Sequence, residues 1–110
     1  MTRSEFCETL AQRFPDIAEI LAEHMTDHDN VLLPHLFLAD VTRYVLTDGR
    51  DRRPIVKFLD DAFESEGQEV EDLIAVSFVE YLVDPEELEK ATKGLDAGHI
   101  RAEWCRQRET

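Results

Sequence analysis

The sequence predicts an all-α fold of six to seven helices, and three observations support this prediction. Apolar residues recur every three to four positions along most of the chain, which is the period of an amphipathic helix. No segment alternates apolar and polar residues between hairpin turns, as a half-buried strand would. Glycines and prolines fall almost entirely where the helical period breaks. A single domain over residues 1–110 is expected, because a chain of 110 residues can enclose one core.

Two helices are predicted in the first quarter of the chain, over residues 4–14 and 15–25. Thr2 and Glu5 have the spacing of a capping box just ahead of the first helix. Pro15 ends that helix and suits the first turn of the second one, because it lacks an N–H group. A polar loop follows the second helix.

Residues 34–46 and 53–66 form the next two predicted helices, each with a proline in its first turn. The earlier helix is expected to end before Asp48 and Gly49. Gly67 is expected to cap the later one, since glycine adopts the left-handed conformation without steric cost.

The helix predicted at residues 69–83 is apolar around most of its circumference, so we expect it at the centre of the fold. Its β-branched residues would also suit a strand, but fifteen residues without glycine or proline are too long for a typical strand. Two short helices follow, one over residues 85–93 and one from about residue 97. Asp84 and Pro85 provide an N-cap and a first-turn proline for the former.

Two pairs of predicted helices align with each other within the sequence. The apolar face of residues 34–46 aligns with that of residues 69–83 at an offset of 37, and residues 15–25 align with residues 53–66 at an offset of 38. The near-equal offsets predict two helical hairpins stacked as a short HEAT-like solenoid. An irregular helical bundle is the alternative, because any two amphipathic helices can be slid into register.

The charge of the chain is concentrated in one block. The thirty-two residues between Lys57 and Lys90 contain twelve Asp and Glu but no Lys or Arg, and the whole chain has a net charge of −13. Such a field repels phosphate backbones and anionic lipids, so we expect neither a nucleic acid nor a membrane as partner. It favours a basic protein partner that arrives by diffusion.

The turn between the predicted helices at 53–66 and 69–83 is the expected binding site. Carboxylates one helical turn apart repel each other and mildly destabilise a helix. No Lys or Arg lies between these carboxylates to relieve the repulsion. Acids that lower helix stability without such relief suggest an interaction surface. The predicted partner-binding residues are Asp60, Asp61, Glu64, Glu66, Glu69, Glu71 and Asp72. A second acidic group surrounds the next turn and comprises Glu80, Asp84, Glu86, Glu87 and Glu89.

Neither catalysis nor a bound cofactor is expected from the sequence. Ser77 lacks the flanking glycines of a nucleophile elbow, and the four scattered glycines form no phosphate-binding loop. His24 and His28 are four residues apart and could start a metal site that Asp27, Asp29 and His35 complete. Histidines near a helix C-terminus are, however, already favoured by its dipole, so we predict no metal.

The compartment is expected to be the cytoplasm. No apolar run approaches the ~18 to 20 residues that span a bilayer, and the N-terminus leads into an amphipathic pattern rather than a signal peptide. Cys7 and Cys105 lie at opposite ends of the chain without a CxxC pairing. We therefore expect two reduced, packed thiols.

Two stretches carry a resemblance to other proteins. They are residues 32–40, LLPHLFLAD, and residues 69–80, EVEDLIAVSFVE. Over roughly the middle two-thirds of its length the chain resembles small, uncharacterised, all-helical bacterial proteins found among the immunity-type proteins of polymorphic toxin systems. The resemblance implies a cytosolic inhibitor that binds and blocks a cognate toxin, often a nuclease, but it transfers no binding residues.

The expected function is therefore that of a non-enzymatic binding protein, an immunity protein that neutralises a cognate basic toxin through an acidic surface. The alternative is a helical adaptor or regulatory subunit that acts by self-assembly or by binding a peptide. A monomer or weak dimer is expected, whereas a stable homodimer would favour the adaptor.

Overall fold

The computed structural model describes residues 1–47 and 51–109, and within these ranges it confirms the predicted all-α class. The seven α-helices of this part are α1 (Arg3–Arg13), α2 (Pro15–Asp27), α3 (Pro34–Leu46), α4 (Arg53–Ser65), α5 (Gln68–Ile74), α6 (Pro85–Thr92) and α7 (Gly98–Arg108). A π-helical turn, η1 (Ala75–Val79), continues α5. The predicted helix end at Asp48 and Gly49 lies outside the described residues.

Helix ends follow the local signals in the sequence. Thr2 and Glu5 form the capping box of α1, with the Glu5 N–H donating to Thr2 Oγ1 at 3.1 Å and the Thr2 N–H donating to Glu5 Oε1 at 2.9 Å. Asp84 caps α6 by accepting from the Glu87 N–H at 2.9 Å. Gly67, with φ of 97°, takes the left-handed conformation between α4 and α5.

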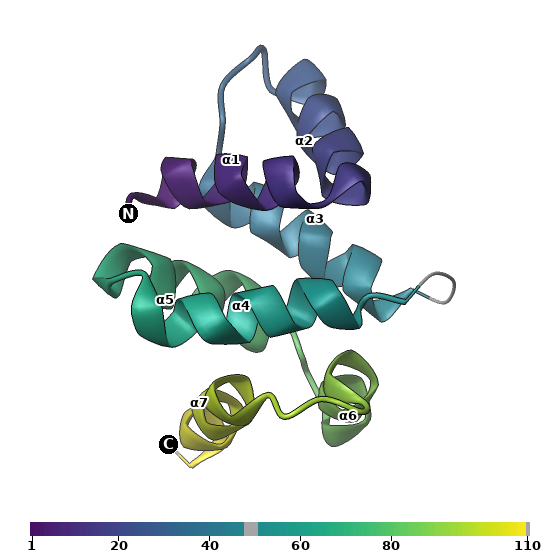
Figure 1. Cartoon of the computed structure of the whole chain (residues 1–110), viewed down its shortest axis with the longest axis vertical. Helices are drawn as coiled ribbons and strands as arrows, with labels where there is room; N and C mark the ends of the chain where they lie inside the picture. The colour runs from purple at the N-terminus through teal and green to yellow at the C-terminus, as the bar shows by residue number, and fades with distance from the viewer. Residues whose placement is uncertain (48–50, 110) are drawn as a thin grey trace.

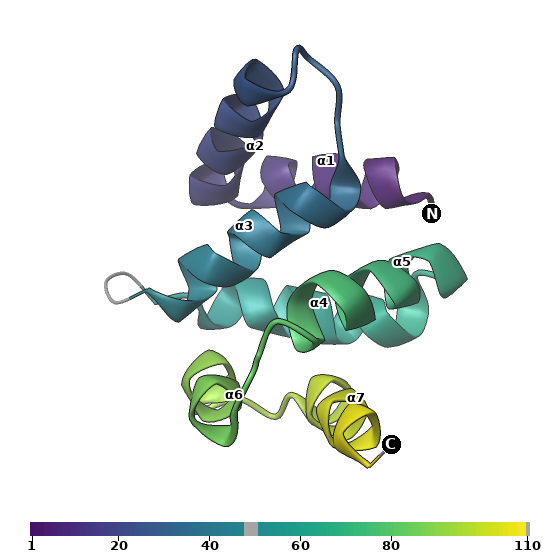
Figure 2. The same cartoon turned by 180° about the vertical axis from the view of Figure 1, so that it is seen from behind.

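The helices form layers along the longest axis of the molecule. Figure 1 shows α1 and α2 at one end, α4 and α5 in the middle and α6 and α7 at the other end, with α3 crossing between the first two layers. Helices α4 and α5 run side by side, whereas α2 contacts α1 and α3 and stands apart from α4 (Figures 1 and 2). The two predicted hairpins thus differ in geometry, and the arrangement is an irregular bundle rather than a regular HEAT-like stack.

One hydrophobic core joins all the helices. Phe6 of α1, Phe37 of α3 and Phe78 of η1 are fully buried within it. Smaller apolar side chains extend the core into the outer layer, where Leu88 of α6 and Ile100 of α7 are buried. Each helix therefore contributes an apolar stripe to the same core, which is the arrangement that an amphipathic period predicts.

The segment predicted as one helix over residues 69–83 is the central element, formed by α5 and η1. It contacts α1, α3, α4 and α7, which explains why it is apolar around most of its circumference. The prediction placed its end too late, because the helix ends at Val79. There the Leu82 N–H bonds to the Val79 carbonyl at 3.1 Å and closes a tight turn, so the chain leaves the helical path.

The π-helical turn is supported by side chains from two neighbouring helices. Its defining bond joins the Glu80 N–H to the Ala75 carbonyl, five residues earlier, at 3.0 Å. The Thr42 hydroxyl of α3 donates to the Ser77 carbonyl at 2.8 Å, and the Gln107 side-chain amide of α7 donates to the Ala75 carbonyl at 3.1 Å. The first bond gives a carbonyl of the buried Ser77 a donor, the second adds a further donor to the Ala75 carbonyl, and together they attach α3 and α7 to the central helix.

We expect Thr42→Val to lower the free energy of unfolding by about 1 to 2 kcal/mol, because valine has a similar shape but cannot donate to the buried Ser77 carbonyl. Thr9→Val is the matched control, since the Thr9 hydroxyl bonds only to the Glu5 carbonyl at 2.8 Å on the surface of α1. It should change the same quantity by about 0.5 kcal/mol or less. Urea denaturation measures both, and equal losses would contradict the role given to Thr42.

Candidate functional site

The seven acids predicted to bind a partner surround the turn between α4 and α5, but they differ in exposure. Asp60 is buried. The exposed members are Asp61, Glu64, Glu69 and Asp72, and the half-buried members are Glu66 and Glu71.

Asp60 has a structural role. Its carboxylate is 3% exposed, and Oδ1 accepts a hydrogen bond from the Ile100 N–H in the first turn of α7 at 2.9 Å. No side chain within α7 caps this helix start, so the negative charge on α4 satisfies an N-terminal N–H and complements the helix dipole. Burial removes Asp60 from the predicted binding set. The sequence did carry a signal for this, because Asp60 lies one turn after Val56, on the buried face of α4.

Exposed acids around the turn have basic partners that the sequence did not reveal. Arg3 Nη1 pairs with Glu69 Oε1 at 3.3 Å and Lys57 Nζ with Asp61 Oδ1 at 3.0 Å, and His99 Nε2 lies 2.8 Å from Glu64 Oε2, a contact that is an ion pair only when His99 is protonated. Two of the three bases come from α1 and α7, which are distant in the sequence. The charge of the block is therefore compensated in part by tertiary contacts, although exposed pairs of this kind contribute only ~0 to 1 kcal/mol each.

Other acids in this region have no ion pair with any described residue. Among residues 1–47 and 51–109, this holds for Glu66, Asp72 and Glu80. Asp72 accepts a hydrogen bond only from the neutral amide of Gln68, at 2.8 Å. We use the term acidic surface for the six accessible members of the predicted set: Asp61, Glu64, Glu66, Glu69, Glu71 and Asp72.

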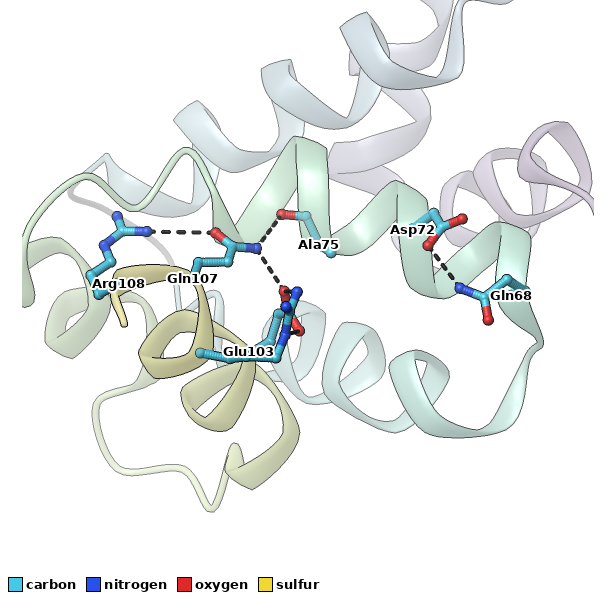
Figure 3. A network of polar contacts seen from close by, with 7 residues as sticks. Gln68, Asp72, Ala75, Glu103, Gln107 and Arg108 are labelled. Carbon is cyan, nitrogen blue, oxygen red and sulfur yellow. Dashed lines mark hydrogen bonds and ion pairs between the residues drawn. The ribbon is translucent and has the colours of Figure 1, made fainter. Parts of the chain in front are cut away.

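A groove of about 520 Å³ lies between the central helix and α7, and we call it the α5–α7 groove. Its lining residues are Asp72, Ala75, Val76, Glu80, Glu103, Arg106, Gln107 and Arg108. Figure 3 shows Gln107 between Ala75 and Glu103, with Asp72 farther along the same helix as Ala75. The sequence did not predict this groove, because its two walls are far apart in the chain and meet only in the folded protein.

The α7 wall of the groove carries a paired charge. Glu103 is 8% exposed, and its two carboxylate oxygens accept from Arg106 Nε at 2.9 Å and Arg106 Nη2 at 2.5 Å. Gln107 adds a further bond to Glu103 at 2.9 Å. The Arg106 hydrogen bonds outweigh burial and lower the pKa of Glu103, while Glu103 raises the pKa of Arg106. Both groups therefore stay charged and neutralise each other.

The histidines considered as metal ligands form a different structure. The His24 and His28 rings stack with centroids 4.3 Å apart. His24 Nε2 accepts from the Leu33 N–H at 3.1 Å, so its proton resides on Nδ1 and neither nitrogen offers a free lone pair. His35 lies elsewhere, with Nδ1 at 2.7 Å from the Ser77 hydroxyl oxygen. Across the described residues, no group of three or more His, Cys, Asp or Glu side chains is placed to hold a metal ion.

The two cysteines differ in environment. Both are free, as the sequence predicted. Cys7 is buried in the core, and burial raises the pKa of its thiol to about 12, so it is not a nucleophile at neutral pH. Cys105 is exposed on α7, which corrects the expectation of two packed thiols, because its position faces away from the Ile100 side of the helix. No helix among the described residues has both the length and the apolar character to cross a bilayer.

Comparison with known proteins identified one family. A family model described as "Domain of unknown function (DUF7674)" matches residues 7–108. Searches of curated proteins and of solved structures gave no match.

We expect Asp60→Ala to lower the free energy of unfolding by about 1 to 3 kcal/mol, because the Ile100 N–H would lose its acceptor in a buried environment. Asp61→Ala changes the neighbouring, exposed carboxylate and should cost about 0.5 kcal/mol or less. Urea denaturation of the two variants tests this difference. Similar values for both would show that the Asp60 carboxylate does not support the start of α7.

We expect the stability of the protein to fall as the pH decreases through the ordinary pKa of histidine, 6.5. Burial, reinforced by the nearby His28, lowers the pKa of His24 in the folded state. The unfolded chain then binds a proton that the folded chain does not, so stability is full above this pH and is lost below it. Thermal unfolding at about pH 7.5 and about pH 5.5 measures the effect. His24→Gln can still accept from Leu33 and should show a smaller pH dependence; an unchanged dependence would assign it to other groups.

Proposed function

The chain belongs to the DUF7674 family, a domain of unknown function, and we propose that it is a non-enzymatic protein that binds and neutralises a cognate basic toxin. The acidic surface is the proposed contact area. Asp60, although part of the acidic block in the sequence, supports this surface from within rather than contacting the partner.

The observation that carries this proposal is the rigid display of accessible carboxylates around one turn. Helices α4 and α5 both bury apolar side chains in the core, and Gly67 joins them in a left-handed turn. Acids that are held in place before binding lose little conformational freedom in a complex. A surface of this kind suits a folded partner with a matching basic patch.

The existing ion pairs do not prevent such binding. The pairs of Glu69 with Arg3 and of Glu64 with His99 are exposed and therefore weak, so a partner's cation can replace the internal base. The net charge of −13 attracts a basic protein over long distances and can raise the association rate to ~10⁸ M⁻¹s⁻¹ at low salt. The resemblance to immunity-type proteins supports a toxin as that partner.

We expect the combined reversals Asp61→Lys, Glu64→Lys, Glu66→Lys and Glu69→Lys to slow association with the partner by about tenfold or more at low salt. The rate should also depend less on ionic strength, because fewer attractive charges remain to be screened. The partner is first identified by affinity capture of the full chain from its native cell and mass spectrometry, where one basic protein at equal stoichiometry is expected. Stopped-flow kinetics then compares the variants.

The matched control reverses four exposed acids on α1 and α2, outside the acidic surface: Glu8, Glu19, Glu23 and Asp27. It changes the net charge by the same amount and should slow association much less. Equal slowing would show that only total charge matters and would contradict the assigned surface. A stable homodimer, with no basic protein captured, would instead favour the adaptor function.

A further inference from the structure

The central helix presents two acids and one apolar side chain to the α5–α7 groove at regular spacing. Asp72 of α5, Val76 of the π turn and Glu80, which directly follows that turn, are each four residues apart, and all three line the groove. Val76 is 47% exposed although it lies between buried residues of α5 and η1. This line of acid, apolar and acid side chains is accessible from solvent.

The two arginines on the opposite wall are held by contacts within the protein. Arg106 is paired with the carboxylate of Glu103 through two hydrogen bonds. Arg108 donates to the Leu82 carbonyl at 2.5 Å and lies 4.5 Å from the centre of the Trp104 ring. Glu103 neutralises Arg106, whereas Arg108 keeps its positive charge; with Asp72 and Glu80 on the other wall, the acids of the lining still outnumber its bases, and its net charge is negative.

That negative charge belongs to Asp72 and Glu80. Asp72 interacts only with the neutral Gln68 amide, and Glu80 makes no side-chain hydrogen bond or ion pair with any described residue. The groove floor is held in place by Gln107, whose amide bonds to both Ala75 and Glu103 (Figure 3). A ligand would thus meet a preformed floor flanked by two carboxylates that have no ion pair with any described residue.

We infer that the α5–α7 groove binds an amphipathic helix of the partner that carries an apolar side chain between two cations, each one helical turn away. The cations would pair with Asp72 and Glu80, and the apolar side chain would cover Val76. A groove between two helices suits the side chains of a third helix, and helix-in-groove binding uses this spacing. The inference rests on the proposed function, because it takes the partner to be basic, and it extends the acidic surface from Asp72 along the central helix.

The test uses the full chain and a synthetic probe: an alanine-rich helical peptide with one leucine flanked by an arginine four residues away on each side. Two-dimensional ¹H–¹⁵N NMR of the labelled protein should show peptide-induced shifts at the amides of residues 72–80 and at the Trp104 indole N–H. A peptide with glutamates in place of the arginines should give no shifts. The double variant Asp72→Asn, Glu80→Gln should weaken binding about tenfold, whereas Val76→Lys should abolish it.

The matched control is Glu23→Gln with Glu86→Gln, two exposed acids outside the groove, which should change the dissociation constant by about twofold or less. Two results would overturn the groove assignment and leave the proposed function intact. One is amide shifts confined to residues 61–69, and the other is peptide binding that does not change with the Asp72 and Glu80 substitutions. Absence of shifts anywhere would also overturn it. The proposed function fails separately if no basic protein is captured from the cell.

Discussion

The fold depends on the enclosure of the central helix, α5 with η1, by four other helices. Its irregular π turn receives hydrogen-bond donors from two of these neighbours, which hold it against them. Thr42 of α3 and Gln107 of α7 supply these donors. The same contacts set the position of α7 beside the central helix, and the capping of Ile100 by Asp60 secures its first turn. The groove between α5 and α7 is a consequence of this attachment.

The acidic block, uniform in the sequence, serves several purposes in the structure. Asp60 is buried and Asp84 caps α6, so these two carboxylates stabilise helix starts. Glu69 pairs weakly with a base from α1, whereas Asp72 and Glu80 have no ion pair among the described residues. Only some of these acids can therefore take part in the proposed binding of a basic partner. Those acids differ in how easily a cation of the partner can reach them.

Part of the candidate site followed from the sequence. The α4–α5 turn and most of its exposed acids were predicted, since Gly67 marks the turn and the helical period separates exposed from buried positions. Asp60 was misassigned because its position on the apolar face was given less weight than its charge. The partners Arg3 and His99 were not predictable, because they approach the turn from the two ends of the chain. The α5–α7 groove was missed for the same reason.

Local structure follows from the order of residues alone: the all-α class, the capping box at Thr2 and Glu5, the proline-led helix starts and the positive-φ turn at Gly67. These features arise from interactions between residues a few positions apart, so a linear pattern contains them. Only the tertiary structure decided the irregular packing of the helices, the π turn and the pairing of the acids. Those features depend on which distant side chains meet in the core. Amphipathic periodicity shows which face of a helix is buried, but it does not show which other helix packs against that face.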